Sequence, residues 1–178
     1  LPGWEEHAST PAKVFQGGPV QLDSALGPLR VVHIGGGSTA SASSTDRLAR
    51  ARSCDIGCVR LTEQFLPGKR AAHREVAALR KHLGKRLTRQ LPKRAWIGAR
   101  IIGSGGTFTN LGRMAVARRG GDPNEPVHGI EVSVAEVEHL VEWLSTRTAL
   151  QRRSVPGLNP ERADIILAGA AAVARLAK

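Results

Sequence analysis

Residues 29–39 read LRVVHIGGGST, a short β-branched run that ends in three consecutive glycines. Such a run is typical of a buried strand that enters a tight turn. The Ala, Ser and Thr residues after Thr39, and then residues 47–54, indicate two further strands that pair back on the first. The sequence therefore predicts a β-meander with a glycine turn after its first strand.

Apolar spacing predicts further elements downstream. Over residues 71–91, apolar side chains recur every three or four positions, as on one face of a helix, and the opposite face is strongly basic. Residues 100–102 are predicted to form another apolar strand. The sequence GSGGT at 103–107 follows, and it leads into a helix from about residue 107 to residue 119 that ends at Gly120.

Capping signals mark two more helices. Ser133 and Glu136 form a capping box ahead of a helix with an apolar face. Asn159 and Pro160 suit the N-cap and the first position of a final helix, in which Gly169 would permit close helix packing. Together these elements predict a single α/β domain over residues 1–178.

Composition narrows the class of partner. The 178 residues include 26 Lys or Arg and 15 Asp or Glu, which gives a formal net charge of +11 and favours an anionic partner. Three Trp, three Phe and no Tyr offer little for recognition of nucleic-acid bases by stacking. No apolar run has the length of a membrane span, and residues 1–10 do not resemble a secretory signal. We therefore predict a cytoplasmic protein with no membrane partner.

Two cysteines, Cys54 and Cys58, are too few for a four-ligand zinc site or a disulfide framework. We interpret both as small buried residues. A bridge between them, or a redox role, is the alternative, which a reducing cytoplasm disfavours.

The stretch GGGST at 35–39 is a candidate anion site. At a strand end, successive backbone N–H groups could converge on a phosphate, with the Ser38 and Thr39 hydroxyls beside it. The alternative is a glycine-rich hairpin without a ligand. Three consecutive glycines lose much conformational entropy on folding, so close approach of a ligand to the backbone is the favoured interpretation.

The stretch GSGGT at 103–107 opens a helix, where unpaired N–H groups and the helix dipole favour a second phosphate or a nucleotide. It is neither a Walker loop nor a dinucleotide fingerprint, because the Gly-Lys-Ser/Thr ending and the G-x-G-x-x-G spacing are both absent.

Several motifs in order resemble the exopolyphosphatase and guanosine pentaphosphate phosphohydrolase (Ppx/GppA) family. The chain carries these stretches: RVVHIGGGST, IGCVRLTEQF (56–65), IIGSGGTFTNLGRM (101–114), VHGIEVS (127–133) and PGLNPERADIILAG (156–169). The resemblance implies a ribonuclease H-like, actin-type ATPase lobe, a mixed sheet flanked by helices. It further implies that this is the second lobe, with the first expected before Leu1 and a closing strand after Lys178.

The resemblance also implies a chemistry. Glu5 and Glu6, in the lead-in segment 1–28, are similar to the family's paired glutamates, so Glu6 would be the catalytic base; an exposed acidic pair is the alternative interpretation. Mg²⁺ would be the cofactor, and a homodimer is compatible with the family. The substrate would be inorganic polyphosphate or guanosine penta- or tetraphosphate. The phosphate-binding residues would be Gly35, Gly36, Gly37, Ser38, Thr39, Gly105, Gly106 and Thr107.

Two positions depart from the family pattern. His33 stands where the family has an aspartate that helps to hold the metal, and Ala40 replaces a glutamate. Mg²⁺ prefers hard oxygen ligands, so the metal affinity should be low. The alternative function is therefore a non-catalytic protein that binds polyphosphate, nucleotide or nucleic acid.

The helix predicted over residues 71–91 gathers Lys and Arg, with Glu75 as the only acidic residue between 69 and 94. A solvated face is one interpretation of this surface. A track for a polyanion, bound through sequence-independent phosphate contacts, is the other.

Overall fold

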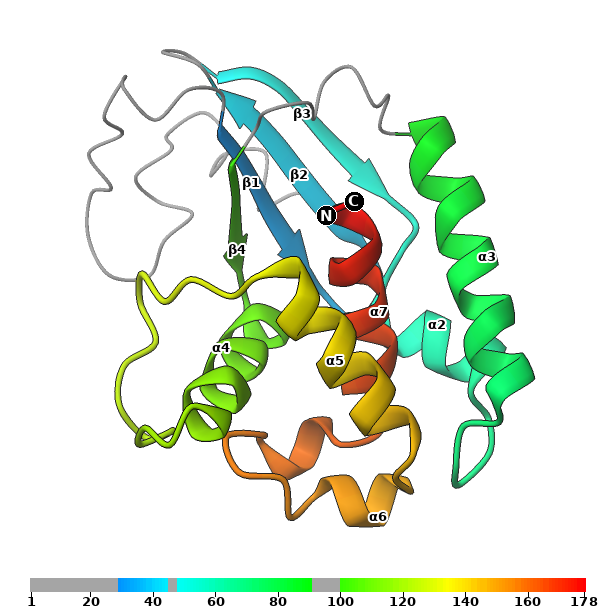
Figure 1. Ribbon diagram of the computed structural model, residues 1–178. Helices are drawn as coiled ribbons and strands as arrows, with labels where there is room; N and C mark the ends of the chain where they lie inside the picture. Colours follow the sequence, from blue (N-terminus) through cyan, green and yellow to red (C-terminus); the bar gives the residue numbers. More distant parts are fainter. Residues whose placement is uncertain (1–28, 45–47, 91–99) are drawn as a thin grey trace.

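The structure is a computed structural model that describes residues 29–44, 48–90 and 100–178. A four-stranded sheet carries helices that pack around a central helix, α7 (Ile166–Leu176) (Figure 1). This arrangement confirms the predicted mixed α/β fold. The predicted lead-in segment, with Glu5 and Glu6, lies outside the described residues.

The sheet has the order β3-β2-β1-β4. Its strands are β1 (Leu29–Ile34), β2 (Thr39–Ser44), β3 (Leu48–Cys54) and β4 (Arg100–Ser104). The first three strands pair antiparallel in sequence order, which confirms the predicted meander. Strand β4 pairs parallel with β1, so the segment between them crosses over before it returns to the sheet.

Three helices agree with the predictions to within two residues at each predicted end. They are α3 (His73–Gln90), α4 (Gly106–Arg118) and α5 (Val134–Ser145). Helix α5 begins with the predicted capping box, because the Ser133 side chain accepts a hydrogen bond from the backbone N–H of Glu136 while the Glu136 carboxylate accepts one from Ser133 N–H.

The final helix begins later than predicted. Asn159 does act as an N-cap, but it caps a single 3₁₀ turn, η4 (Pro160–Arg162). After this turn, the Ile165 N–H donates to the Arg162 carbonyl three residues back, and Nη1 of the buried Arg152 donates to the Ala163 carbonyl at 3.5 Å. Helix α7 therefore starts at Ile166, and not at Asn159.

Two short helices were not predicted from the sequence, α2 (Cys58–Phe65) and α6 (Ala149–Arg152). Helix α6 has a capping box formed by Thr148 and Gln151. That pattern is visible in the sequence and would have indicated the helix.

The core is organised around α7, whose residues are buried on every face except at Arg175. Five alanines and Gly169 keep the helix thin, so that α2, α3, α4 and α5 can all pack against it. A Cβ atom at Gly169 would lie 2.8 Å from Thr107 Cγ2, which fits the prediction that this glycine permits close packing. None of the described helices is long and apolar enough to cross a membrane.

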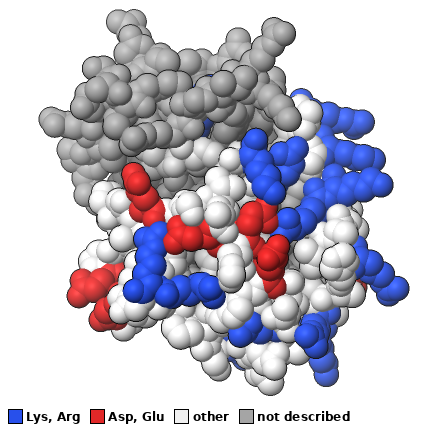
Figure 2. Space-filling view, in the orientation of Figure 1, with Lys and Arg blue, Asp and Glu red and all other residues white. Residues whose placement is uncertain are grey.

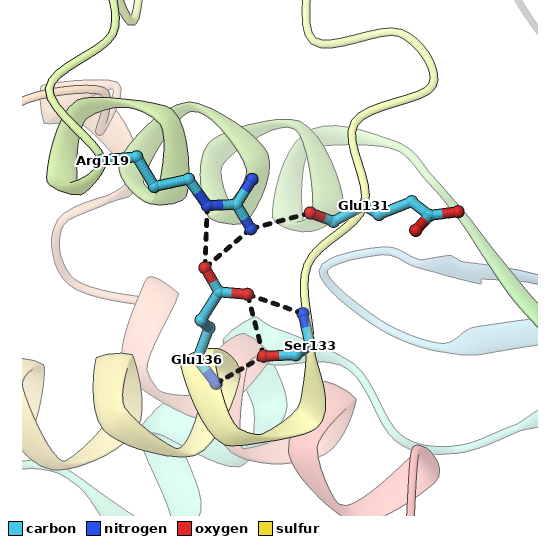
Figure 3. Close-up of polar contacts among 4 residues, drawn as sticks. All are labelled: Arg119, Glu131, Ser133 and Glu136. Atoms are coloured by element: carbon cyan, nitrogen blue, oxygen red, sulfur yellow. Dashed lines mark hydrogen bonds and ion pairs between the residues drawn. The ribbon is translucent and has the colours of Figure 1, made fainter.

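An ion pair between Arg119 and Glu136 joins helices α4 and α5 (Figure 3). Arg119, at the end of α4, donates from Nε and Nη2 to Glu136 Oε1 at 2.9 and 2.6 Å, and Nη2 also reaches the Glu131 carbonyl. The second carboxylate oxygen of Glu136 accepts from Ser133 N–H at 2.9 Å. These contacts, led by the Ser133 backbone hydrogen bond, lower the pKa of Glu136 to about 2.

Glu136→Gln is expected to remove a pH-dependent part of the stability. Because the folded pKa is depressed, the stabilisation is fully present above the unfolded pKa and is lost as the pH falls from about 5 towards 2. The pair is partly exposed, so we expect a loss of only about 1 kcal/mol at pH 7. Urea unfolding at pH 7 and pH 3 measures it: the difference between wild type and variant should shrink at the lower pH.

Glu142→Gln is the matched control, since this exposed residue on the same helix makes no side-chain hydrogen bond or ion pair with described residues. A Glu136→Gln difference that stayed constant with pH would contradict the electrostatic explanation.

Candidate functional site

The two glycine loops meet at one edge of the sheet. Strands β1 and β4 are parallel neighbours, with His33 opposite Ser104, so their carboxyl ends lie side by side. The first loop (35–38) leaves β1 and the second (Gly105 and the start of α4) leaves β4. The sheet thus brings together two segments about seventy residues apart in the sequence, at the edge where α/β sheets bind ligands.

The first loop is held from one side by α2. The Gly35 carbonyl accepts hydrogen bonds from Cys58 N–H at 3.0 Å and from Cys58 Sγ at 3.3 Å, and the Gly36 carbonyl accepts from Val59 N–H at 3.0 Å. The N–H groups of Cys58 and Val59, at the start of α2, therefore donate hydrogen bonds to the loop. A Cβ atom at Gly57 would lie 2.2 Å from the Gly36 oxygen, so only glycine fits here.

These contacts determine where the loop's donors point. A trans peptide directs its N–H opposite to its C=O, so the N–H groups of Gly36 and Gly37 point away from α2. Neither N–H makes a hydrogen bond to the described residues. The loop thus presents two adjacent free donors on its outer side, an arrangement that can bind an anion.

The threonine hydroxyls differ from the expectation. Thr39 is fully buried and its hydroxyl donates to the Ile56 carbonyl. Thr107 is 2% exposed, and its hydroxyl lies 3.5 Å from the Ile34 carbonyl. Both hydroxyls therefore brace the loops from inside the core, whereas Ser38 is half-buried in the first loop.

The second loop requires glycine at Gly105. This residue has φ +86°, in the left-handed region, and forms the N-cap of α4. The His33 ring lies against it, since a Cβ atom at Gly105 would be 2.5 Å from His33 Cε1. The first N–H groups of α4, from Gly106 onward, have no partner within the helix and face the same edge.

Arg162 is a site residue that the sequence did not single out. Its guanidinium lies over the start of α4, where a Cβ atom at Gly106 would be 2.3 Å from Cζ. Arg162 is half-buried, and its side chain makes no hydrogen bond or ion pair with a described residue. Within the described part of the chain, the Arg162 guanidinium is therefore a cation without a carboxylate partner, next to the N–H groups at the start of α4.

Burial, and then the charge of Arg162, lower the pKa of His33. The lowered pKa favours the neutral imidazole at pH 7, so the positive charge of the site comes chiefly from Arg162. Cys54 and Cys58 are free and buried, which confirms the sequence interpretation, and burial raises the pKa of both thiols.

A separate basic surface covers α3 (Figure 2). Arg80 pairs with Glu138 at 2.7 Å, and Arg52 of β3 donates to the Gln90 carbonyl at the end of α3. The remaining exposed cations of α3 have no carboxylate within ion-pair distance among the described residues; they are Arg74, Lys81, Lys85, Arg86 and Arg89. Binding of a polyanion by this surface remains a prediction, and a solvated face is the alternative.

Comparison with known proteins identifies relatives over most of the chain. The profile of the Ppx/GppA phosphatase family matches residues 14–178. Exopolyphosphatase 2 of Mycobacterium tuberculosis is 34% identical over 170 residues, which cover 92% of this chain and 51% of the relative. The chain thus spans about half the length of the curated relatives it matches.

Solved structures agree on the fold. The Aquifex aeolicus member of the Ppx/GppA family superposes with a TM-score of 0.72 at 25% identity, covering 84% of this chain and 48% of that chain. An exopolyphosphatase-like protein superposes with a TM-score of 0.76 at 23% identity, covering 98% of this chain and 56% of that chain. The sheet and helices described above are therefore those of the family's actin-like fold.

Proposed function

The chain belongs to the Ppx/GppA phosphatase family, and from this membership we propose that it is a phosphate-holding lobe of a phosphohydrolase. The proposed substrate is inorganic polyphosphate or guanosine penta- or tetraphosphate, from which water would release the terminal phosphate. The observation that supports this proposal is the meeting of two glycine loops and Arg162 at one sheet edge.

The residues of this lobe would bind and orient the phosphate. The N–H groups of Gly36 and Gly37 and those at the start of α4 would donate to its oxygens, and the Arg162 guanidinium would balance its charge. Neutral His33 could accept or donate a hydrogen bond without adding charge. The assignment of Glu6 as the base, the cytoplasmic location and the homodimer remain predictions.

The described residues do not fit a magnesium ion. His33 and Ala40, the two positions that depart from the family's acidic pattern, are directly opposite each other in the β1–β2 pairing. Family carboxylates at these positions would be cross-strand neighbours, whereas here they are an imidazole and a methyl group. No group of three or more His, Cys, Asp or Glu residues in the described part of the chain could hold a metal ion.

This departure supports a second candidate function, a binder of phosphate polyanions that does not hydrolyse them. Both candidates share the same binding site. Release of phosphate from long-chain polyphosphate, measured beside equilibrium binding, separates them, because binding without release favours the second.

Gly106→Ala is expected to weaken binding of tripolyphosphate about tenfold, since a hydrogen bond to a charged group contributes about 1.5–3 kcal/mol. The added methyl group would displace only the flexible end of Arg162, so the fold should persist. Titration calorimetry with tripolyphosphate, together with a thermal melt, measures both properties.

Gly84→Ala, on α3, is the control. Its Cβ atom would meet only the Arg175 side chain, at an ordinary distance of 3.4 Å from Nε. Unchanged binding in Gly106→Ala would contradict the role of Arg162. A wild-type chain that bound no tripolyphosphate would contradict the proposed site itself.

A further inference from the structure

Asn110 occupies an unusual place inside α4. It lies in the second turn of the helix and is 5% exposed. Asparagine is a weak helix former, because its amide competes for backbone hydrogen bonds, and burying an amide is unfavourable unless both of its ends are paired. A buried asparagine in a helix therefore calls for specific partners.

Both ends of the amide have such partners. Asn110 Nδ2 donates to the Gly106 carbonyl at 2.7 Å, and Asn110 Oδ1 accepts from the backbone N–H of Asn159 at 2.6 Å. The first contact fastens the amide to the start of α4. The second crosses to the segment before η4, 49 residues away in the sequence.

Asn159 is hydrogen-bonded both to Asn110 and to Arg162. Its side chain caps η4 by accepting from Glu161 N–H at 3.0 Å, and its carbonyl accepts from Arg162 N–H at 2.9 Å. The Arg162 guanidinium then returns to lie over Gly106. The contacts form a closed ring that runs from Gly106 through Asn110, Asn159 and Arg162 back to Gly106.

We propose that Asn110 is a positioning residue that holds the Arg162 guanidinium over the second glycine loop. The Arg162 side chain has no hydrogen bond or ion pair of its own with the described residues, so the backbone anchor at Asn159 and packing on Gly106 determine its position. The consequence for phosphate binding rests on the proposed function, whereas the placement of Arg162 does not.

Asn110→Ala is expected to weaken binding of tripolyphosphate about fivefold, the equivalent of one hydrogen-bond link of about 1 kcal/mol. The same substitution in an Arg162→Met background should change the affinity less than twofold, because the group that Asn110 positions is then absent. An equal loss in both backgrounds, or no loss in either, would overturn the proposal.

A second readout does not depend on a ligand. Arg162 is the second cause, after burial, of the lowered pKa of His33. In titrations of the His33 ring by NMR, Arg162→Met should raise that pKa, and Asn110→Ala should move it in the same direction. If Arg162→Met raises the pKa and Asn110→Ala leaves it at the wild-type value, Asn110 does not position Arg162.

Two further variants complete the design. Thr148→Ala removes one capping hydrogen bond at α6 and should leave the His33 pKa and the affinity unchanged. If Asn110→Ala does not fold, Asn159→Ala removes the side-chain cap of the turn that carries Arg162 but keeps both backbone contacts of Asn159, and it should raise the His33 pKa by less than Arg162→Met does. A wild-type chain without affinity for tripolyphosphate would refute the proposed phosphate site, while the His33 titration would still decide the role of Asn110.

Discussion

Replacing His33 with aspartate is expected to weaken binding of tripolyphosphate about a hundredfold in EDTA and to make it depend on Mg²⁺. The His33 ring lies against Gly105, between the two glycine loops. A carboxylate there would repel a bound phosphate by about 3 kcal/mol, between the limits for bulk water and for a partly buried pair. Because Mg²⁺ prefers carboxylate oxygens, added Mg²⁺ should restore much of the affinity.

The measurement compares wild type and His33→Asp by calorimetry, each in EDTA and in excess Mg²⁺. His139→Asp adds the same charge at an exposed position on α5 and controls for the change in net charge. Equal affinity of His33→Asp and wild type in EDTA would show that His33 does not face the ligand.

Gly57→Ala should strongly reduce the stability of the fold. Its Cβ atom would lie 2.2 Å from the Gly36 oxygen and 2.3 Å from the Gly37 carbonyl carbon, which are backbone atoms that cannot turn aside. The conformation of Gly57 itself is ordinary and extended, so the cost comes from this contact alone. We expect a loss of about 3 kcal/mol, or roughly 10 °C in Tm for a domain of this size.

The same substitution should abolish phosphate binding, because the loop must move away from α2 and its N–H groups lose their orientation. Gly37→Ala is the matched control for stability, since its Cβ atom would meet nothing within 4 Å. Its Tm should stay within about 1 °C of wild type, the usual range for a surface change without contacts. Equal melting of the two variants would contradict the contact between Gly57 and the loop.

The elements that the sequence predicted correctly are those specified by local signals. Strand β1 was predicted at its observed limits because a β-branched run meets three glycines, and α5 because its capping box lies next to an apolar face. Helix α2 carries no such signal. It buries only Cys58 and Leu61 and has no side-chain cap, since the carbonyls of Gly35 and Gly36 cap it from another part of the chain.

The candidate site shows the same contrast between features with a local sequence signal and features that depend on distant contacts. Each glycine loop was recognisable by itself, and the resemblance to the family related them to one function. Arg162 could not be placed, because its position depends on the 3₁₀ turn after Asn159 and on the contact of that turn with Asn110. The Asn159 and Pro160 signal was real, but the sequence does not show that it starts one turn instead of the whole helix.

The parallel pairing of β1 with β4 also affects the order in which the chain can fold. The meander of β1, β2 and β3 needs only local contacts, whereas the β1–β4 pair must close a loop of about seventy residues and should form late. A partly folded chain with the meander alone would have one glycine loop and half of the donors. The proposed phosphate binding therefore requires the completed domain, and a ligand that binds there would act chiefly by slowing its unfolding.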